Sequence, residues 1–131
     1  MSLTSRHLMP DGIRFALSSI KRQKNVVSAS LETEEFYRAI VNIKRRGFYP
    51  NLKVYIADVY VLTASDVIEV IDNYPSVNCI VVISNWDHYT NLAKEEGLKN
   101  SLGIFTIDEF LEALNYRGKE FLDIGTANRS E

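Results

Sequence analysis

The chain has little cysteine and no long hydrophobic run, and each absence excludes a class of protein. A single cysteine, Cys79, cannot form an internal disulfide, and no cluster of Cys and His has the spacing of a zinc site. No apolar run approaches the roughly 18 residues of a membrane-spanning helix, and no signal-peptide core is visible. The chain also lacks a glycine-rich phosphate loop, which argues against a nucleotide-binding enzyme. We therefore expect a cytoplasmic protein with no membrane partner.

The composition that remains is that of a globular domain. The 131 residues are 46% hydrophobic and 24% charged, which excludes disorder and low complexity. A chain of this length fits one domain and leaves little room for two. We expect one α/β domain over residues 1–118 and a tail or linker over residues 119–131.

Charge is distributed unevenly along the chain. Residues 1–53 hold ten Lys and Arg against four acids, a net charge of +6, so the other 78 residues carry −8. Such a split is typical of a half that faces nucleic acid. Alternatively, Lys21-Arg22 and Lys44-Arg45-Arg46 end helices, where cations complement the helix dipole. We prefer the second interpretation because no aromatic or glycine-rich stretch is interleaved with these charges.

Residue patterns predict an alternation of helices and strands. Five helices are expected. The first begins at Asp11 or Gly12, and the others run from Thr33 to Gly47, from Ser65 to Tyr74, over residues 88–97 and from Ile107 to Arg117. The helix after Thr33 is predicted from Thr33 as its N-cap and from the apolar stripe of Phe36, Ile40 and Ile43. The expected strands are Asn25–Ser30, Leu52–Leu62, Asn78–Ser84 and Gly103–Thr106, with a weaker fifth at Ser5–Met9.

A strict alternation of strands and helices implies a parallel sheet with helices on both faces. With five strands the usual solution is a flavodoxin-like (βα)5 three-layer sandwich of strand order 2-1-3-4-5. Ligands bind such a sheet beyond the carboxyl ends of its strands. Four candidate side chains would lie along that edge: Asp11, Asp58, Ser84 and Thr106.

The chain resembles a response-regulator receiver domain over roughly residues 5–117. The segment Phe48-Tyr-Pro-Asn-Leu-Lys-Val-Tyr-Ile-Ala-Asp58 is similar to the family's strand that ends in the phosphoacceptor aspartate. Asn73-Tyr-Pro-Ser-Val-Asn-Cys-Ile-Val-Val-Ile-Ser84 is similar to its fourth strand, which ends in Ser or Thr. Glu96-Gly97 and Ile104-Phe-Thr-Ile-Asp-Glu-Phe-Leu-Glu-Ala-Leu114 are similar to its last strand and helix.

The resemblance implies a phosphorelay site. Asp58 would take a phosphoryl group from a partner histidine kinase, Mg²⁺ would lie between Asp58 and Asp11, and Ser84 would bind the phosphate. Two positions depart from the family pattern: Asp11 is the only acid after the first strand, and Thr106-Ile107 replaces a Lys that usually precedes Pro. We therefore expect weak or absent phosphorylation of Asp58.

The resemblance also implies that the protein acts mainly by binding other proteins. The expected partners are a histidine kinase or another signalling protein, and a second copy of the chain through residues 88–116. Glu109 and Glu112 are expected to lie outside the core and to be free to meet a basic partner. Nucleic acid would be bound only through an output domain outside this chain.

Alternative interpretations stay open for these residues. Asp58 is an edge or capping acid in the simplest alternative, and Ser84 caps the helix that follows it. The segment from Val54 to Leu114 also resembles part of a restriction-endonuclease-like fold, a degenerate domain that binds or cleaves nucleic acid. There Asp58 and Glu69 would hold a divalent metal, but Ile71 stands where such nucleases usually have Lys.

Overall fold

The structure is a computed structural model that describes residues 11–35, 38–83 and 88–126. The described residues form helices and strands in one order along the chain: α2 (Asp11–Lys21), β1 (Val26–Glu35), β2 (Arg38–Arg45), β3 (Leu52–Ala57), α3 (Ala64–Asn73), β4 (Cys79–Val82), α4 (Asn91–Lys99), β5 (Gly103–Thr106), α5 (Ile107–Ala113) and α6 (Gly118–Asp123). No helix of these three described stretches is long and apolar enough to cross a membrane.

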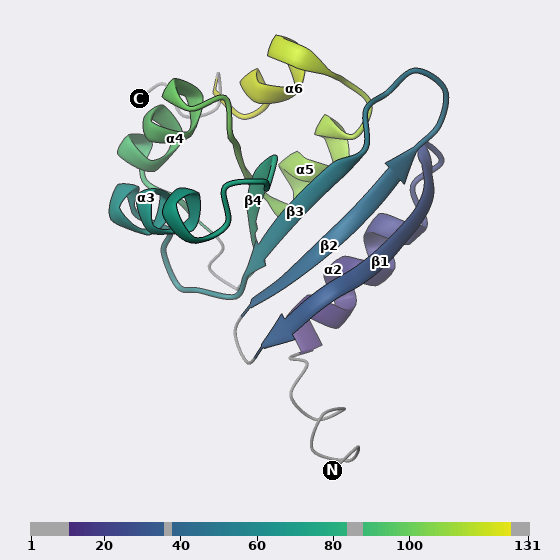
Figure 1. Cartoon of the computed structure of the whole chain (residues 1–131), viewed down its shortest axis with the longest axis horizontal. Coiled ribbons are helices and arrows are strands. Elements are labelled where there is room, and N and C mark those ends of the chain that lie inside the picture. Colours follow the sequence, from purple (N-terminus) through teal and green to yellow (C-terminus); the bar gives the residue numbers. More distant parts are fainter. Residues whose placement is uncertain (1–10, 36–37, 84–87, 127–131) are drawn as a thin grey trace.

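The sheet is mixed, and the prediction of an all-parallel flavodoxin-like sheet is wrong. Its strand order is β1-β2-β3-β4-β5, so every strand pairs with its neighbours in sequence (Figure 1). β1 and β3 each run antiparallel to β2, whereas β3, β4 and β5 are parallel. The expected strand at Ser5–Met9 lies outside the described residues.

The error arose at the helix predicted from Thr33 to Gly47. Thr33 lies in β1, and β2 occupies most of the rest of that segment. Ile40 and Ile43, expected on one helical stripe, lie on opposite faces of the sheet and in different core clusters. β-branched residues fit the pleated surface of a strand, and β2 pairs on both sides, so its backbone groups are satisfied without a helix.

The other predicted helices lie near their expected positions, whereas two strands differ in length. β3 is the central strand, β5 matches Gly103–Thr106, and α2, α3, α4 and α5 lie where helices were expected. β1 continues to Glu35, five residues beyond the expected end at Ser30, and β3 ends at Ala57, five residues before the expected end at Leu62. α3 and α5 begin with capping boxes, Thr63 with Asp66 and Thr106 with Glu109.

Helices cover the two faces of the sheet unequally (Figure 1). α2, α5 and α6 pack on one face, where the core cluster contains residues of β1, β2, β3, β4 and β5. α3 and α4 pack on the other face, where the cluster takes no residue from β1 and only Ile40 from β2. On that second face β1 and most of β2 are left open to solvent.

α6 extends the packed fold into the segment beyond residue 118. Its Phe121 is buried and its ring lies 5.1 Å from that of Phe105, edge to face. β1, at the opposite edge of the sheet, is a long strand with two register shifts against β2, between Val26 and Ser28 and between Leu31 and Thr33.

Candidate functional site

Asp58 lies directly after β3, at the carboxyl edge of the parallel strands, and is half-buried. The first turn of α2 is its neighbour, since a Cβ built on Gly12 would lie 3.6 Å from Asp58 Oδ2. The structure therefore brings Asp58 next to the turn that Asp11 opens. Phosphorylation of Asp58 and a Mg²⁺ site at Asp11 and Asp58 stay predictions.

Thr106 serves as the N-cap of α5. Its hydroxyl accepts a hydrogen bond from the Glu109 backbone N–H at 3.3 Å, and the Glu109 carboxylate accepts one from the Thr106 backbone N–H at 3.1 Å. Thr106 pairs with Val82, and Val82 with Ala57, so Thr106 is two strands, about 10 Å, from the end of β3. Ser84 lies outside the described residues.

Two acids singled out in the sequence have other surroundings than expected. Glu69, the second metal ligand of the nuclease-like alternative, lies on α3 and not on a strand beside Asp58. Glu109 is not free for a partner, because the Tyr89 hydroxyl donates to its Oε1 at 2.8 Å. Within residues 11–35, 38–83 and 88–126, no group of three or more His, Cys, Asp or Glu is placed to hold a metal ion.

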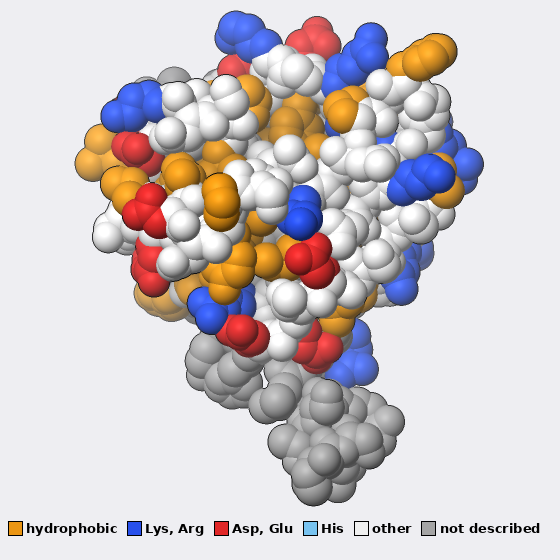
Figure 2. All heavy atoms as spheres, viewed as in Figure 1, with side chains coloured by type: hydrophobic (Ala, Val, Ile, Leu, Met, Phe, Trp, Pro, Cys, Tyr) orange, Lys and Arg blue, Asp and Glu red, His pale blue; other side chains and the backbone are white. Residues whose placement is uncertain are grey.

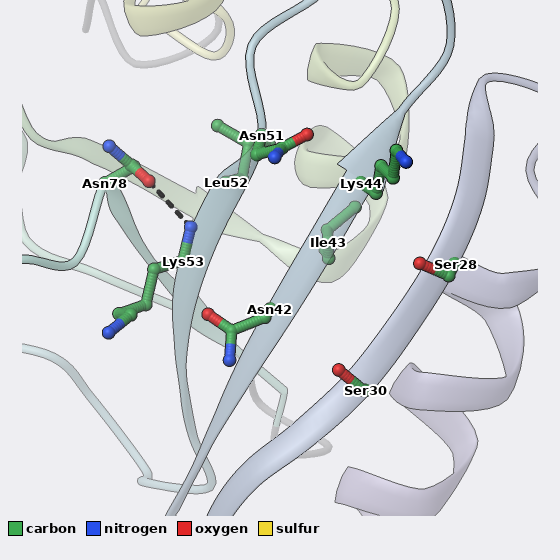
Figure 3. A pocket seen from close by; sticks show the side chains of 9 residues that line it. All are labelled: Ser28, Ser30, Asn42, Ile43, Lys44, Asn51, Leu52, Lys53 and Asn78. Carbon is green, nitrogen blue, oxygen red and sulfur yellow. Dashed lines mark hydrogen bonds between the residues drawn. The ribbon is translucent and has the colours of Figure 1, made fainter.

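A polar hollow lies elsewhere, on the open face of β1, β2 and β3 (Figure 3). We call it the open-face hollow; it has a volume of about 320 Å³ and is lined by Ser28, Ser30, Asn42, Ile43, Lys44, Asn51, Leu52, Lys53 and Asn78. Sheet register sets these side chains in rows: Ser30 pairs with Asn42 and Asn42 with Lys53, while Ser28 pairs with Lys44.

Backbone pairing fixes the far wall of the open-face hollow. The Asn78 side-chain oxygen accepts from the Lys53 backbone N–H at 2.6 Å (Figure 3). The Asn78 backbone N–H donates to Lys53 O at 2.7 Å. Because its oxygen is used in this way, the Asn78 amide has its NH₂ group left to donate. The Asn78 side chain is thus held in place at this wall.

One acid borders the hollow and orients two of its residues. Glu32 Oε1 accepts from Asn42 Nδ2 at 2.9 Å and lies 3.2 Å from Lys53 Nζ. The hydrogen bond from Asn42 and then that from Lys53 hold the pKa of Glu32 below its usual value. The Lys44 side chain forms no ion pair or hydrogen bond with the residues that the structure describes, so its charge is available to a ligand.

A basic strip continues from the hollow around the adjacent end of the sheet. Lys24 and Arg46 are exposed and adjacent, since the Arg46 guanidinium donates to Lys24 O. Phe48, in the turn between β2 and β3, is 92% exposed. Figure 2 shows Lys and Arg side chains gathered on the β1–β2 side and around this turn, whereas acids gather over α3.

Sequence reasoning missed this surface because it assigned β2 to a helix and its cations to the helix end. The available signal was the alternation of Val41, Ile43 and Arg45 with Asn42 and Lys44, which has the period of a half-buried strand. Read that way, Asn42 and Lys44 share one solvent-facing row.

Comparison of the chain with protein-family models, with curated proteins and with solved structures finds no match.

Proposed function

We propose that the protein binds nucleic acid through the open-face hollow and the basic strip beside it. The observation that carries this proposal is a set of hydroxyl, amide and ammonium groups on a sheet face that none of the described helices covers. Most contacts between proteins and nucleic acids go to phosphate and sugar oxygens, and Lys, Arg, Ser and Asn side chains make them. The face therefore fits the backbone of a strand and not a base sequence.

The geometry of the hollow suits an extended anion better than a compact one. Lys44 and Lys53 lie on neighbouring strands, and Lys24 and Arg46 extend the positive charge beyond the end of β2. The exposed ring of Phe48 offers a surface on which a base can stack. Phe48 lies two residues after Arg46, in the turn at that end of β2.

The mixed sheet does not strengthen the nuclease-like alternative. That fold would pair residues 58–62 with residues 66–71 as an antiparallel hairpin, but residues 64–73 form α3. The antiparallel strands of this sheet precede Asp58. With Glu69 on a helix, we propose binding without cleavage.

Fluorescence anisotropy with a labelled single-stranded oligonucleotide tests the proposal. We expect binding that weakens with salt, with a slope that falls by about 0.7 for each phosphate contact removed. Lys44→Glu should weaken binding about tenfold or more, since it replaces an attraction by a repulsion. Arg14→Glu is the matched control, because Arg14 is exposed on α2, which packs on the other face of the sheet.

The outcome against the proposal is equally specific. Equal effects of Lys44→Glu and Arg14→Glu would indicate attraction by overall charge and would remove the open face as the site. No binding at low salt would reject nucleic acid altogether. Cleavage of the oligonucleotide with Mg²⁺ present, lost in Asp58→Asn, would restore the nuclease interpretation.

A further inference from the structure

A second cavity, of about 420 Å³, lies between the beginning of β3, the turn before β5 and α6. We call it the Arg45 cavity. Its polar lining is Arg45, Asn51, Asn78, Ser101 and Lys119, and its apolar lining includes Leu52, Phe121 and Leu122. It shares Asn51, Leu52 and Asn78 with the open-face hollow, so the two spaces meet at the beginning of β3.

Arg45 is the unusual member of this lining because it is 3% exposed. Its Nε donates to Pro50 O at 2.9 Å, and its Nη1 donates to Leu114 O at 3.1 Å and Tyr116 O at 2.7 Å. The rings of Tyr49 and Phe121 lie 5.2 and 5.6 Å from the guanidinium carbon. These contacts hold the guanidinium group in one position.

The charge of Arg45 has no counter-ion among the described residues. Its hydrogen-bond acceptors are three neutral carbonyl groups, and its Nη2 makes no hydrogen bond with any described residue. Burial accordingly lowers the pKa of Arg45. A buried cation is normally paired, since removing a charge from water is unfavourable unless an opposite charge replaces the solvent.

We propose that the Arg45 cavity binds a phosphomonoester, the group carried by a nucleoside monophosphate or by the phosphorylated end of a nucleic-acid strand. A phosphate oxygen would accept from Arg45 Nη2, and the neighbouring amides and Ser101 would donate to the remaining oxygens. The apolar wall formed by Leu52, Phe121 and Leu122 would contact the rest of the nucleotide. The strand-end source rests on the proposed function, whereas binding of a free nucleotide does not.

Lys119 stands at the rim and supplies the second charge. Its Nζ pairs with Asp123 Oδ2 at 2.8 Å, but its side chain is 85% exposed. Exposed pairs of this kind contribute little, so Lys119 can turn toward an anion in the cavity. A phosphomonoester carries more charge than an internal phosphodiester, which favours a strand end over the middle of a strand at this place.

Two measurements test the proposal. Titration with adenosine monophosphate, followed by NMR, should shift the Arg45 Nε–H signal and leave the side-chain signal of Arg14 unchanged. In anisotropy, an oligonucleotide with a terminal phosphate should bind about tenfold tighter than the same strand with hydroxyl ends. Lys119→Glu should remove most of that preference, and Lys99→Glu is its matched control because Lys99 is also exposed and paired along its own helix.

Each outcome decides the matter. Arg45→Lys keeps the charge but loses the planar guanidinium group, so this variant should weaken nucleotide binding. If the Arg45→Lys variant does not fold, Lys119→Glu provides the same test of nucleotide binding. No shift at Arg45 with adenosine monophosphate or inorganic phosphate at millimolar concentration would overturn the proposal. A shift at Arg45 without preference for phosphorylated ends would assign the cavity to free nucleotides, whatever the open-face hollow binds.

Discussion

The parallel half of the sheet (β3, β4 and β5) and the antiparallel half (β1 and β2) differ in how many of their faces helices cover. In the parallel half, β4 is buried along its whole length because helices cover both faces. In the antiparallel half, two residues of β1 are buried, Val26 and Ala29, and α2 packs against the strand. A strand covered on one face has the other face available for polar side chains, and there the donors of the open-face hollow lie.

The comparison of the two halves shows which strands can carry polar side chains that face solvent. The side chains of strands that are buried on both faces belong to the core, so polar side chains such as Asp58 lie at the ends of these strands. The antiparallel half can change its solvent-facing residues without disturbing the core. Lys44 and its buried neighbour Ile43 illustrate this separation of roles along a single strand.

The largest expected effect on the free energy of unfolding comes from truncating core side chains in the parallel half of the sheet. Ile80→Ala on β4 and Phe105→Ala on β5 point to opposite faces, and both should lower the free energy of unfolding, by about 2–5 and 3–5 kcal/mol. Lys44→Ala on β2 should change it by no more than about 0.5 kcal/mol. Urea unfolding measures all three, and a small effect at Ile80 would mean that α3 and α4 do not cover that face.

Arg45 links the two halves, and its removal comes next in size. Arg45→Met should destabilise the protein by about 1–3 kcal/mol or more, because the buried carbonyl of Leu114 loses its donor. The comparison variant is Arg46→Met, whose side chain is exposed and should matter little. Thermal unfolding followed by circular dichroism measures both, and equal melting temperatures would show that Arg45 does not hold the α5–α6 connection.

Substitutions in the two capping boxes should have a smaller effect on the free energy of unfolding, and they test the role of Thr63 and Thr106 as N-caps. Thr63→Ala and Thr106→Ala should each lower the free energy of unfolding by about 1 kcal/mol, since each hydroxyl accepts a backbone N–H at the beginning of a helix. Serine at either position should restore most of the loss. If Thr106→Ala instead left stability unchanged and altered ligand binding, Thr106 would be a site residue and not a cap.

The smallest effect concerns Glu32 beside the open-face hollow. Because its folded pKa is lowered, its contribution to stability is present above its usual pKa and is lost as the pH falls through the lowered value. A carboxyl carbon NMR titration should show the lowered pKa of Glu32, and Asn42→Ala should move it back toward the usual value. Glu32→Gln should also strengthen oligonucleotide binding, because it removes the negative charge beside Lys53.

The sequence allowed prediction of the parallel half and not of the antiparallel half, for identifiable reasons. Cys79–Val82 and Gly103–Thr106 are short apolar runs, each followed along the chain by a helix whose N-cap, Thr90 or Thr106, is recognisable. Residues 38–45 carry apolar side chains at positions that fit both a helix and a strand. Pairing with β1 and β3, which is a long-range property, decides between them.

The candidate site was harder to predict than the fold. Asp58 was expected late in a strand that continues to Leu62, whereas β3 ends at Ala57 and Asp58 follows it directly. The open-face hollow depends on which sheet face lacks a helix, and the Arg45 cavity depends on contacts between β2 and residues about 70 positions later, 69 for Leu114 and 71 for Tyr116. Local patterns contain neither kind of information.

The two register shifts of β1 have a consequence for how copies of this protein meet. β1 is an edge strand of ten residues, and a long flat edge invites pairing with the edge of another molecule. Bulges bend and twist such an edge, and Glu32, Glu34 and Glu35 add like charges along it. We therefore expect β1 to resist strand addition between copies, which keeps the neighbouring open face accessible in a crowded solution.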